Sequence, residues 1–440
     1  MRRATPEDVL ELAPFQGLRY ATADARALID SPTLDLALAL APPYDVVDAQ
    51  TATDLVRGDP HNAVRLTLPP AAREAGDPPW ELCGPDRYQR AALTLRRWVA
   101  EGVLVRDPTP ALYVYEQTSP TGHRQRGLIG ALRLPPPDSP VVRPHEAVLA
   151  GPVADRARLM AATRANLEPI FLLYQGGNPV RGAATLTVDA IAQSSTEALV
   201  DTVTGDGVTH RLWAISDTAT LRAVATDLAA RTALIADGHH RYAAYQRLRA
   251  ERDGPGPWDH GLAFLVDSDA WPPRLGAIHR VLPKVEAGWA ARTAREVAVV
   301  EELSGGDLRS ALARLRDAAG RGPALLLADS GTCFLLHGFD RDRLRAAMPD
   351  RSHQWRRLPT SVLERVLLPL WGVADTSVRL VHDEADGALA AARPDGSAVI
   401  LPPLEVSDVY AVTARGELTP RKSTSFGPKP RTGLVLRAFP

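Results

Sequence analysis

Short apolar runs that alternate irregularly with amphipathic stretches constrain the fold of this 440-residue chain more than any other feature. The runs PIFLLYQ, TALIA and GLAFLVD have the length and residue types of buried strands. The stretches DRYQRAALTLRRWVAEG and HRYAAYQRLRAER have the spacing of helices. Because strands and helices intermix without the steady rhythm of a doubly wound sheet, the sequence predicts an α+β fold with mixed sheets and packed helices.

Proline-rich stretches and changes of pattern suggest three domains. The cluster LPPPDSP marks a boundary near residue 138, and the pattern changes again near residue 285. We therefore expect an N-terminal α+β domain over 1–138, a central domain over 139–285 and a C-terminal α+β domain over 286–440. Within the first, LDLALALAPPYDVV is expected to be a strand entering a turn and HNAVRLTLP a second strand.

Charge and composition exclude several classes of partner. A formal net charge of -1 provides no field that would attract nucleic acid or an anionic membrane. No window approaches 18 uninterrupted apolar residues, and the first residues contain no run of signal-peptide length. The two cysteines, Cys83 and Cys333, are far apart, which argues against a disulfide framework or a cysteine zinc site. We expect a cytoplasmic protein with no nucleic-acid or membrane partner, and the oligomeric state stays open.

Lysine is unusually rare in this chain. Of 51 basic residues only three are lysine, namely Lys284, Lys422 and Lys429. A position that keeps lysine where arginine prevails suggests a need for a compact, rotatable ammonium group. Lys422 and Lys429 both lie in RKSTSFGPKPRTG, where Ser423 and Thr424 add hydroxyl groups. We interpret this segment as one that neutralises phosphate charge; the alternative is a solvated C-terminal loop.

The stretch LIADGHHRYAAYQRL, residues 234–248, contains the most concentrated group of reactive side chains. A turn between the expected strand and helix would place Gly238 and Arg241 at a helix N-terminus, where unpaired N–H groups favour phosphate. His239 and His240 can donate hydrogen bonds or move a proton near neutral pH. A carboxylate such as Asp237 is repelled by phosphate unless it binds Mg²⁺ or accepts a proton. This combination favours phosphoryl transfer over simple phosphate storage.

Two other interpretations of these residues remain open. Asp-Gly is ordinary turn chemistry, and adjacent histidines at a helix start often only cap it. A zinc site could use His145, His239, His240 or His279, although the spacing of known zinc motifs is missing.

The sequence DGHHRYAAYQ resembles the phosphate-binding box of the ParB/sulfiredoxin superfamily, which reads DGHHR in free serine kinases. Over nearly the whole chain, the sequence also resembles a bacterial and archaeal family known as domain of unknown function one-thousand-and-fifteen. The matching motifs are APPYDVV, HNAVRLTLP, RPHE with ADRARLMAATRANLEPIF, ADGHHRYAAY, IHRVLP and PRKSTSFGPKPRTGLV. The resemblance implies that the central domain is a ParB/sulfiredoxin-like phosphate-binding domain.

The superfamily resemblance also implies roles for individual residues. A nucleotide phosphate would lie at Gly238 to Arg241, with Asp237 and a histidine near the transferred group. Sulfiredoxins use a cysteine where this chain has His239, so sulfinic acid reduction is not expected. Free serine kinases use an upstream glutamate as base, for which Glu146 is our first candidate and Asp45 our second.

Further polar residues of the same motifs are candidates for substrate binding. Tyr44 follows two prolines, and Asn62 with Arg65 could reach a ligand from the HNAVRL stretch. Arg143 and His145 flank Pro144 before Glu146, and Asn166 could orient a carboxylate or amide. His279 and Arg280 are expected to end an apolar strand, where a ligand would be reached from the sheet edge. Each of these residues also has an ordinary structural interpretation, such as a turn, a surface ion pair or a helix cap.

The leading functional hypothesis is an enzyme that transfers a phosphoryl group between ATP or ADP and a small hydroxylated metabolite, such as a serine-like amino acid. It would use Mg²⁺, for which Asp237 is a possible ligand. On this hypothesis, replacing His240 and Arg241 by alanine abolishes turnover and leaves the fold intact. The alternatives are a nucleotide-binding switch without small-molecule chemistry and a metal-dependent phosphate-ester hydrolase. The sequence leaves the acceptor, the nucleotide and the direction of reaction open.

Overall fold

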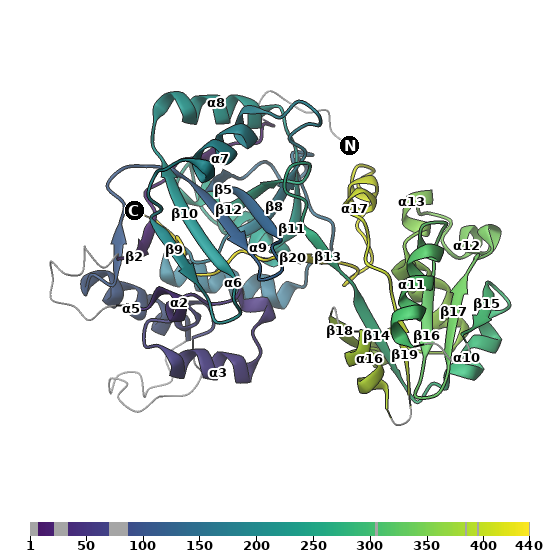
Figure 1. Cartoon of the computed structure of the whole chain (residues 1–440). Coiled ribbons are helices and arrows are strands. Elements are labelled where there is room, and N and C mark those ends of the chain that lie inside the picture. Colours follow the sequence, from purple (N-terminus) through teal and green to yellow (C-terminus); the bar gives the residue numbers. More distant parts are fainter. Residues whose placement is uncertain are drawn as a thin grey trace. The chain divides into compact units, whose positions relative to one another are not determined.

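The computed structural model describes residues 8–21, 34–69, 87–303, 307–382, 385–393 and 396–439. Two compact units account for the chain (Figure 1). Unit 1 consists of Met1–Pro144, Val148–Pro273 and Pro428–Pro440, and unit 2 consists of His145–Ala147 and Arg274–Gly427. The division into three domains at 138 and 285 stays a prediction.

A mixed sheet of nine strands forms the centre of unit 1. In spatial order its main path is β6 (Val142–Arg143), β11 (Ala233–Asp237), β8 (Ile170–Tyr174), β12 (His260–Asp267), β5 (Arg124–Arg133), β4 (Leu112–Thr118), β10 (Thr209–Ile215) and β9 (Val200–Val203). The ninth strand, β1 (Leu12–Ala13), pairs with β5. β12 runs parallel to β8 and antiparallel to β5, so the sheet is mixed.

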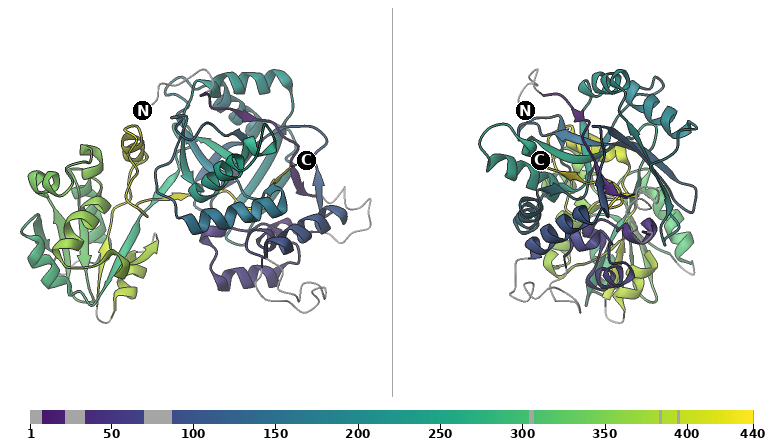
Figure 2. Two further views of the ribbon diagram at one scale, coloured as in Figure 1. Left: turned by 180° about the vertical axis from the view of Figure 1, so that it is seen from behind. Right: turned by 90° about the vertical axis from the view of Figure 1, so that its left-hand side faces the viewer.

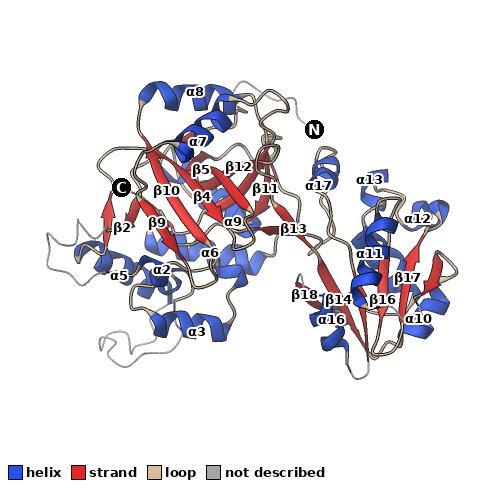
Figure 3. Cartoon of the chain, in the orientation of Figure 1, coloured by secondary structure: helices blue, strands red, loops and turns tan. Residues whose placement is uncertain are grey.

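Four helices share one core with this sheet. They are α6 (Ala150–Thr163), α7 (Ala183–Gln193), α8 (Thr218–Ala229) and α9 (His239–Ala250). Alternate residues of β8, such as Ile170 and Leu172, face this core, as the two-residue period of a strand requires. Phe171 lies between them on the other side, where it stacks on Phe264 of β12. Figure 3 shows the helices and strands of this unit by colour.

Two expected strands near the N-terminus are wrong, because the structure has helical turns there. Residues 34–47 contain α2 (Leu36–Ala39) and the 3₁₀ turn η1 (Tyr44–Val46), and residues 61–69 contain α4 (Val64–Thr67). The side chain of Asp35 accepts from the Ala37 N–H, and Asn62 accepts from the Val64 N–H at 2.9 Å. These polar side chains start helical turns that the apolar pattern alone does not reveal.

The short N-terminal elements form a second core in unit 1. Besides α2 and α4, they are β2 (Leu18–Tyr20), α5 (Arg87–Ala100) and β3 (Leu104–Arg106). The helix α3 (Ala49–Gly58) instead contributes Val56 to a small separate core with Ala63 and Val64. The C-terminal segment completes this part of the unit. Its β21 (Arg437–Ala438) pairs with β7 (Ala165–Asn166), and Leu436 bridges to Leu18. Figure 2 shows this segment, in yellow, among the purple and teal elements.

Unit 2 contains a six-stranded sheet with helices on both faces. Its strands are, in spatial order, β15 (Val299–Glu302), β17 (Cys333–His337), β16 (Leu325–Ala328), β19 (Gly396–Ile400), β14 (Ile278–Pro283) and β18 (Arg379–His382). Neighbouring residues of β16 alternate between two cores, since Leu325 belongs to one and Leu326 to the other. A separate pair joins β13 (Arg274–Gly276) to β20 (Ser425–Gly427).

The helical elements of unit 2 surround this sheet. They are α10 (Ala287–Ala294), α11 (Leu308–Ala319), α12 (Arg341–Ala347), α13 (His353–Arg356), α14 (Pro359–Val362), the π-helical turn η4 (Leu363–Leu367), α15 (Leu368–Leu370), the 3₁₀ turn η5 (Asp375–Ser377), α16 (Ala385–Ala392) and α17 (Val406–Thr413). The expectation of an α+β fold with mixed sheets and packed helices is confirmed. Among the described residues, no helix is both long and apolar enough to cross a membrane.

Candidate functional site

The strand–turn–helix expected around DGHHR is present. β11 ends at Asp237, Gly238 has a φ of 91°, and α9 begins at His239. A side chain at Gly238 would be strained in this left-handed conformation, and its Cβ would lie 3.0 Å from Ile170 Cγ2. Glycine therefore allows the chain to turn closely over β8 and to start the helix beside the end of β11.

Arg241 lies one turn into α9 and points back at the end of β11. Its side chain is 2% exposed, its Nη2 donates to Asp237 Oδ2 at 2.7 Å, and its Nη1 donates to the Pro169 carbonyl at 2.8 Å. Although burial lowers the pKa of Arg241, the carboxylates of Glu168 and Asp237 raise it overall. Two of its donors thus hold Asp237 and the residues before β8, and its buried Nε has no hydrogen-bond partner among the described residues.

Lys429 completes a cluster with two aspartates from distant parts of unit 1. Its Nζ lies 2.6 Å from Asp237 Oδ1 and also contacts Oδ2 of Asp45, a residue of the 3₁₀ turn η1. Burial lowers the pKa of Lys429, but Asp237 and Asp45 raise it overall. Burial likewise raises the pKa of Asp237, but Lys429 and Arg241 hold it below 3.8. We call Asp45, Asp237 and Lys429 the acid–lysine cluster.

Glu168 positions two segments of this cluster. Its Oε1 accepts from the Tyr44 N–H at 2.9 Å and from the Thr432 hydroxyl at 2.8 Å. One carboxylate thereby holds the turn that carries Asp45 and the segment that carries Lys429. Burial raises the pKa of Tyr44 to about 12, and the guanidinium of Arg156 lies 4.2 Å from the centroid of its ring. Sequence reasoning missed Glu168, although it lies in the quoted motif RANLEP.

The two histidines of the box are half-buried at the start of α9. His240 Nε2 accepts from the Leu149 N–H at 3.1 Å, at the residue that precedes α6. This contact ties the start of α9 to the start of α6. It also requires an unprotonated Nε2, so the imidazole is neutral when this hydrogen bond is made.

Four other predicted residues of unit 1 make internal hydrogen bonds. Asn62 donates to the carbonyls of residues 38 and 40, and Arg65 donates to the Val56 carbonyl at 2.6 Å. Arg143 donates to the Pro140 carbonyl at 3.0 Å, and Asn166 accepts from Arg437 at 3.0 Å. These contacts fit the ordinary structural interpretation, and binding of substrate by these four residues stays a prediction.

The remaining predicted residues belong to unit 2. His145 is buried and pairs with the Thr424 hydroxyl at 2.8 Å, while Glu146 accepts from the Lys422 N–H at 3.3 Å. The hydroxyl of Ser423 donates to the Pro420 carbonyl. His279 Nδ1 accepts from the Leu401 N–H at 3.2 Å; burial, with Arg280, lowers its pKa to about 4. The segment RKSTSFGPKP is thus divided, because its last three residues, Pro428 to Pro430 with Lys429 among them, lie in unit 1 and the others in unit 2.

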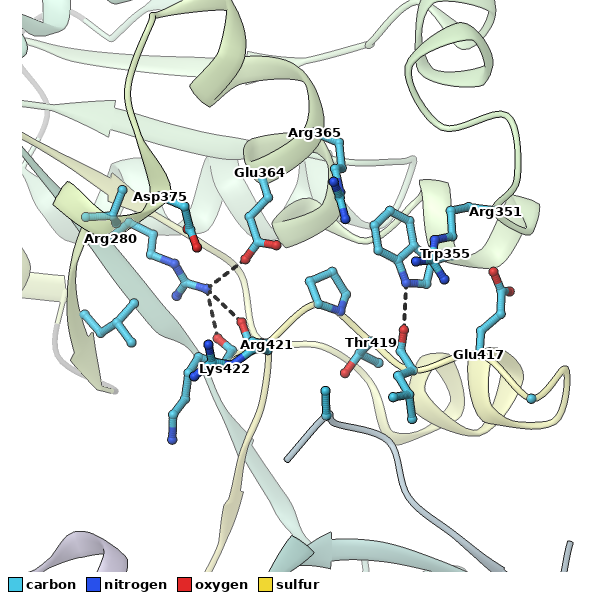
Figure 4. Close-up of a pocket in the computed structure, with 16 residues that line it drawn as sticks. Arg280, Arg351, Trp355, Glu364, Arg365, Asp375, Glu417, Thr419, Arg421 and Lys422 are labelled. Atoms are coloured by element: carbon cyan, nitrogen blue, oxygen red, sulfur yellow. Dashed lines mark hydrogen bonds and ion pairs between the residues drawn. The ribbon is translucent and has the colours of Figure 1, made fainter. Parts of the chain in front are cut away.

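Arg280 lines a cavity within unit 2, which we call the Arg280 pocket (Figure 4). The cavity has a volume of about 590 Å³. It is bounded by Arg280 of β14, Glu364 and Arg365 of η4, Asp375 of η5 and the segment 416–422. Except for Arg280 and Lys422, no lining residue was selected from the sequence, because most of the others come from stretches, such as 351–380, outside the motifs named above.

The described residues contain no group of three or more histidine, cysteine, aspartate or glutamate side chains that could hold a metal ion. Of the histidines named for a zinc site, His145 and His279 belong to unit 2 and His239 and His240 to unit 1, and this zinc site stays a prediction. Mg²⁺ needs fewer protein ligands, because it binds through one or two carboxylates together with phosphate oxygens and water. Asp45 and Asp237 meet that requirement. Cys83 lies outside the described residues, and Cys333 carries a free thiol.

Residues 12–360 match the model of a family described as "Protein of unknown function (DUF1015)". This range contains APPYDVV, RPHE, ADGHHRYAAY and IHRVLP, whereas PRKSTSFGPKPRTGLV lies beyond it. No curated protein matches the chain.

Three similar solved structures are a mutant free serine kinase with ADP, C-terminally truncated SbnI from Staphylococcus aureus and a conserved hypothetical protein from Pyrococcus furiosus. Their sequence identities are 14%, 10% and 13%, and their TM-scores are 0.34, 0.37 and 0.33. The matches cover 67%, 70% and 68% of this chain and 88%, 87% and 92% of those chains. At such low TM-scores the likeness carries no argument about the site.

Proposed function

The chain belongs to the family described as "Protein of unknown function (DUF1015)", and we propose that it transfers a phosphoryl group between a nucleotide and a small hydroxylated metabolite at the acid–lysine cluster. The observation that carries this proposal is the contact of one largely buried ammonium group with two carboxylates beside the N-terminus of α9. Phosphoryl transfer needs fixed cations for the transferred group and a carboxylate for the attacking hydroxyl. These are the groups that the cluster brings together.

The charge states of the cluster support separate roles for the two aspartates. Asp237 remains ionised because its pKa is held low, so it suits the binding of Mg²⁺ or the orientation of Lys429. When bound there, Mg²⁺ would neutralise negative charge on the phosphate. Asp45 is the more exposed of the two carboxylates and suits the role of proton acceptor. Glu146 was the first candidate for the base; it belongs to unit 2 and accepts from the backbone of Lys422.

The transfer step uses these groups as follows. The acceptor oxygen forms a bond to the terminal phosphorus while the bond from that phosphorus to the bridging oxygen breaks. The hydroxyl proton passes to Asp45, and the nucleotide leaves with one phosphate fewer. Lys429 neutralises charge on the transferred group, and the N-terminus of α9 receives phosphate oxygens next to Gly238, which has no side chain of its own. The resemblance of DGHHR to free serine kinases supports serine-like amino acids as the first acceptors to test.

The test is phosphorus NMR of the purified chain with Mg²⁺, ATP or ADP, and a pool of hydroxylated amino acids and small metabolites. We expect a new phosphomonoester signal that disappears in Asp45→Asn, whose exposed carboxylate can be replaced with little effect on folding. Asp201→Asn, a change of the same kind at an exposed aspartate of β9, serves as the control and should keep the signal. A missing ester with every acceptor, or full turnover by Asp45→Asn, would contradict the proposal.

A further inference from the structure

The Arg280 pocket of unit 2 has a strong excess of positive charge. Five cationic side chains line it, and three carboxylates oppose them. The cations are Arg280, Arg351, Arg365, Arg421 and Lys422. Figure 4 shows that they come from several sides of the cavity rather than from one helix face. The three carboxylates only partly balance the five cations, so an anionic ligand would reduce the repulsion among them.

Buried contacts hold the walls of this pocket in place. Arg280 is 3% exposed, its Nη1 donates to the Ile278 carbonyl at 2.7 Å, and its Nη2 donates to the Lys422 carbonyl at 3.0 Å. Arg280 therefore fixes the segment that carries Arg421 and Lys422. Glu364 and Arg365 lie on the π-helical turn η4, a conformation that is rare and frequently found at functional sites.

The pocket also offers an apolar surface. Trp355 is buried, and its indole N–H donates to the Leu418 carbonyl at 2.8 Å, which fixes the ring at the pocket wall. Leu380 of β18 lines the same cavity although it is 42% exposed. The volume of about 590 Å³ exceeds what a bare inorganic anion fills and falls within the range of small-molecule sites.

We infer that the Arg280 pocket binds a phosphate monoester that carries a small apolar group. Guanidinium groups on different sides of the cavity fit the several oxygens of a tetrahedral dianion, and Trp355 with Leu380 would cover the organic part. This site is separate from the acid–lysine cluster and shares no residue with it. The inference does not rest on the proposed function, because binding is measured without nucleotide or Mg²⁺.

Glu364 provides a readout specific to this pocket. Burial raises the pKa of Glu364 to about 7. The guanidinium groups of Arg280 and Arg365 act against this rise, and the carboxylate of Asp375 acts with it. As the pH falls through 7, the carboxyl takes a proton and the pocket loses one negative charge. Anion affinity should therefore rise toward acid pH, and the rise should depend on Glu364.

The experiment is calorimetric titration of the full chain with phenyl phosphate at low ionic strength, alongside inorganic phosphate. We expect phenyl phosphate to bind more tightly than inorganic phosphate. The variants Arg365→Gln and Arg421→Gln should each weaken binding by about tenfold, the effect of losing one charged hydrogen bond. Arg309→Gln is the matched control, because Arg309 is an exposed arginine of α11 outside the pocket and should leave binding unchanged.

The same titration with Glu364→Gln tests the carboxyl. Glutamine keeps the shape of the side chain but not its charge, so binding at pH 8 should tighten and the extra pH dependence of the wild-type protein should vanish. The ligand's own titration is common to both proteins and cancels in the comparison. The inference is overturned if phenyl phosphate does not bind, if inorganic phosphate binds equally well, if Arg309→Gln loses as much affinity as Arg421→Gln, or if Glu364→Gln keeps the wild-type pH profile.

Discussion

Lys429 is the residue on which the proposed chemistry depends most directly. Lys429→Met removes the ammonium group that contacts Asp45 and Asp237, and it should reduce kcat by about 10²-fold or more, as the loss of one preorganised charge donor does elsewhere. Lys429→Arg should not rescue turnover, because a planar guanidinium cannot replace a compact ammonium between two carboxylates. Steady-state kinetics would measure both. Lys284→Met, at an exposed lysine of unit 2, removes the same charge and should keep full activity.

Asp237 should make folding of unit 1 sensitive to acid. Its pKa is below 3.8 in the folded chain, so its ion pairs stabilise the protein fully above that value. This contribution is lost as the pH falls through the lower, folded-state pKa. The difference in unfolding free energy between wild type and Asp237→Asn should therefore be constant near neutral pH and shrink below about pH 4. Urea unfolding at a series of pH values would measure it, and a difference that grows toward acid would contradict this linkage.

Arg241 should be required for folding as well as for the site. Arg241→Met removes a buried cation from the carboxylates of Glu168 and Asp237, of which Asp237 keeps Lys429, and we expect a loss of about 3–5 kcal/mol in unfolding free energy. The sequence-based expectation that alanine at His240 and Arg241 leaves the fold intact therefore needs revision. Denaturant unfolding would test this, and Arg247→Met, at an exposed arginine of the same helix, should change stability by less than about 1 kcal/mol.

At the scale of single elements, the turn between β11 and α9 depends on glycine. Gly238→Ala places a Cβ 3.0 Å from Ile170 and in a left-handed backbone conformation, which should cost at least about 1–2 kcal/mol. Gly254→Ala provides a comparison: its φ is 74°, but nothing lies within 4 Å of the added Cβ. Thermal unfolding of both variants separates the backbone cost, which they share, from the contact cost, which only Gly238 has. Equal losses of stability in the two variants would show that the side chain of Ile170 moves away from the added Cβ at no cost in free energy.

Elements with a long, regular pattern could be predicted from the sequence, and short elements could not. β8, β12 and α5 were predicted because burial leaves uninterrupted apolar runs in strands and a 3.6-residue period in helices. The four-residue helices α2 and α4 were predicted as strands, since one turn is too short to show its period. The longer helix α8 has a local start signal, because the side chain of Asp217 before it accepts from two N–H groups of the first turn.

The candidate site was predictable only in its local parts. The turn at Gly238 follows from neighbouring residues, and the rarity of lysine drew attention to Lys429. The contacts of Lys429 with Asp45 and Asp237 join three segments that are far apart in the sequence. Nothing in the local sequence of any of these segments indicates that they meet in the folded chain. Glu168 was missed for the same reason, since its partners Tyr44 and Thr432 are remote in the chain.

At the scale of the whole molecule, the last segment of the chain belongs to unit 1 although unit 2 precedes it. Truncation after Gly427 removes the buried residues Leu434, Val435 and Leu436 together with Lys429. We expect the unfolding free energy of unit 1 to fall by several kcal/mol, because each large buried aliphatic side chain contributes about 1.5–3 kcal/mol to stability. Unit 2 should keep its stability.

Hydrogen exchange resolved by mass spectrometry would locate this effect. Faster exchange confined to peptides of unit 1, such as those of β8 and α9, would agree with the expectation. Equal acceleration in β16 and β19 of unit 2 would contradict it, because the two compact units would then unfold together.

The return of the chain to unit 1 at Pro428 also has a consequence for biosynthesis. A ribosome makes the chain from its N-terminus, so all of unit 2 is translated before the residue that closes the acid–lysine cluster emerges. A nascent or prematurely released chain therefore contains Asp45 and Asp237 without their ammonium partner. Completion of the site is thereby made conditional on translation through the whole of unit 2, and products that end before Lys429 lack the proposed activity.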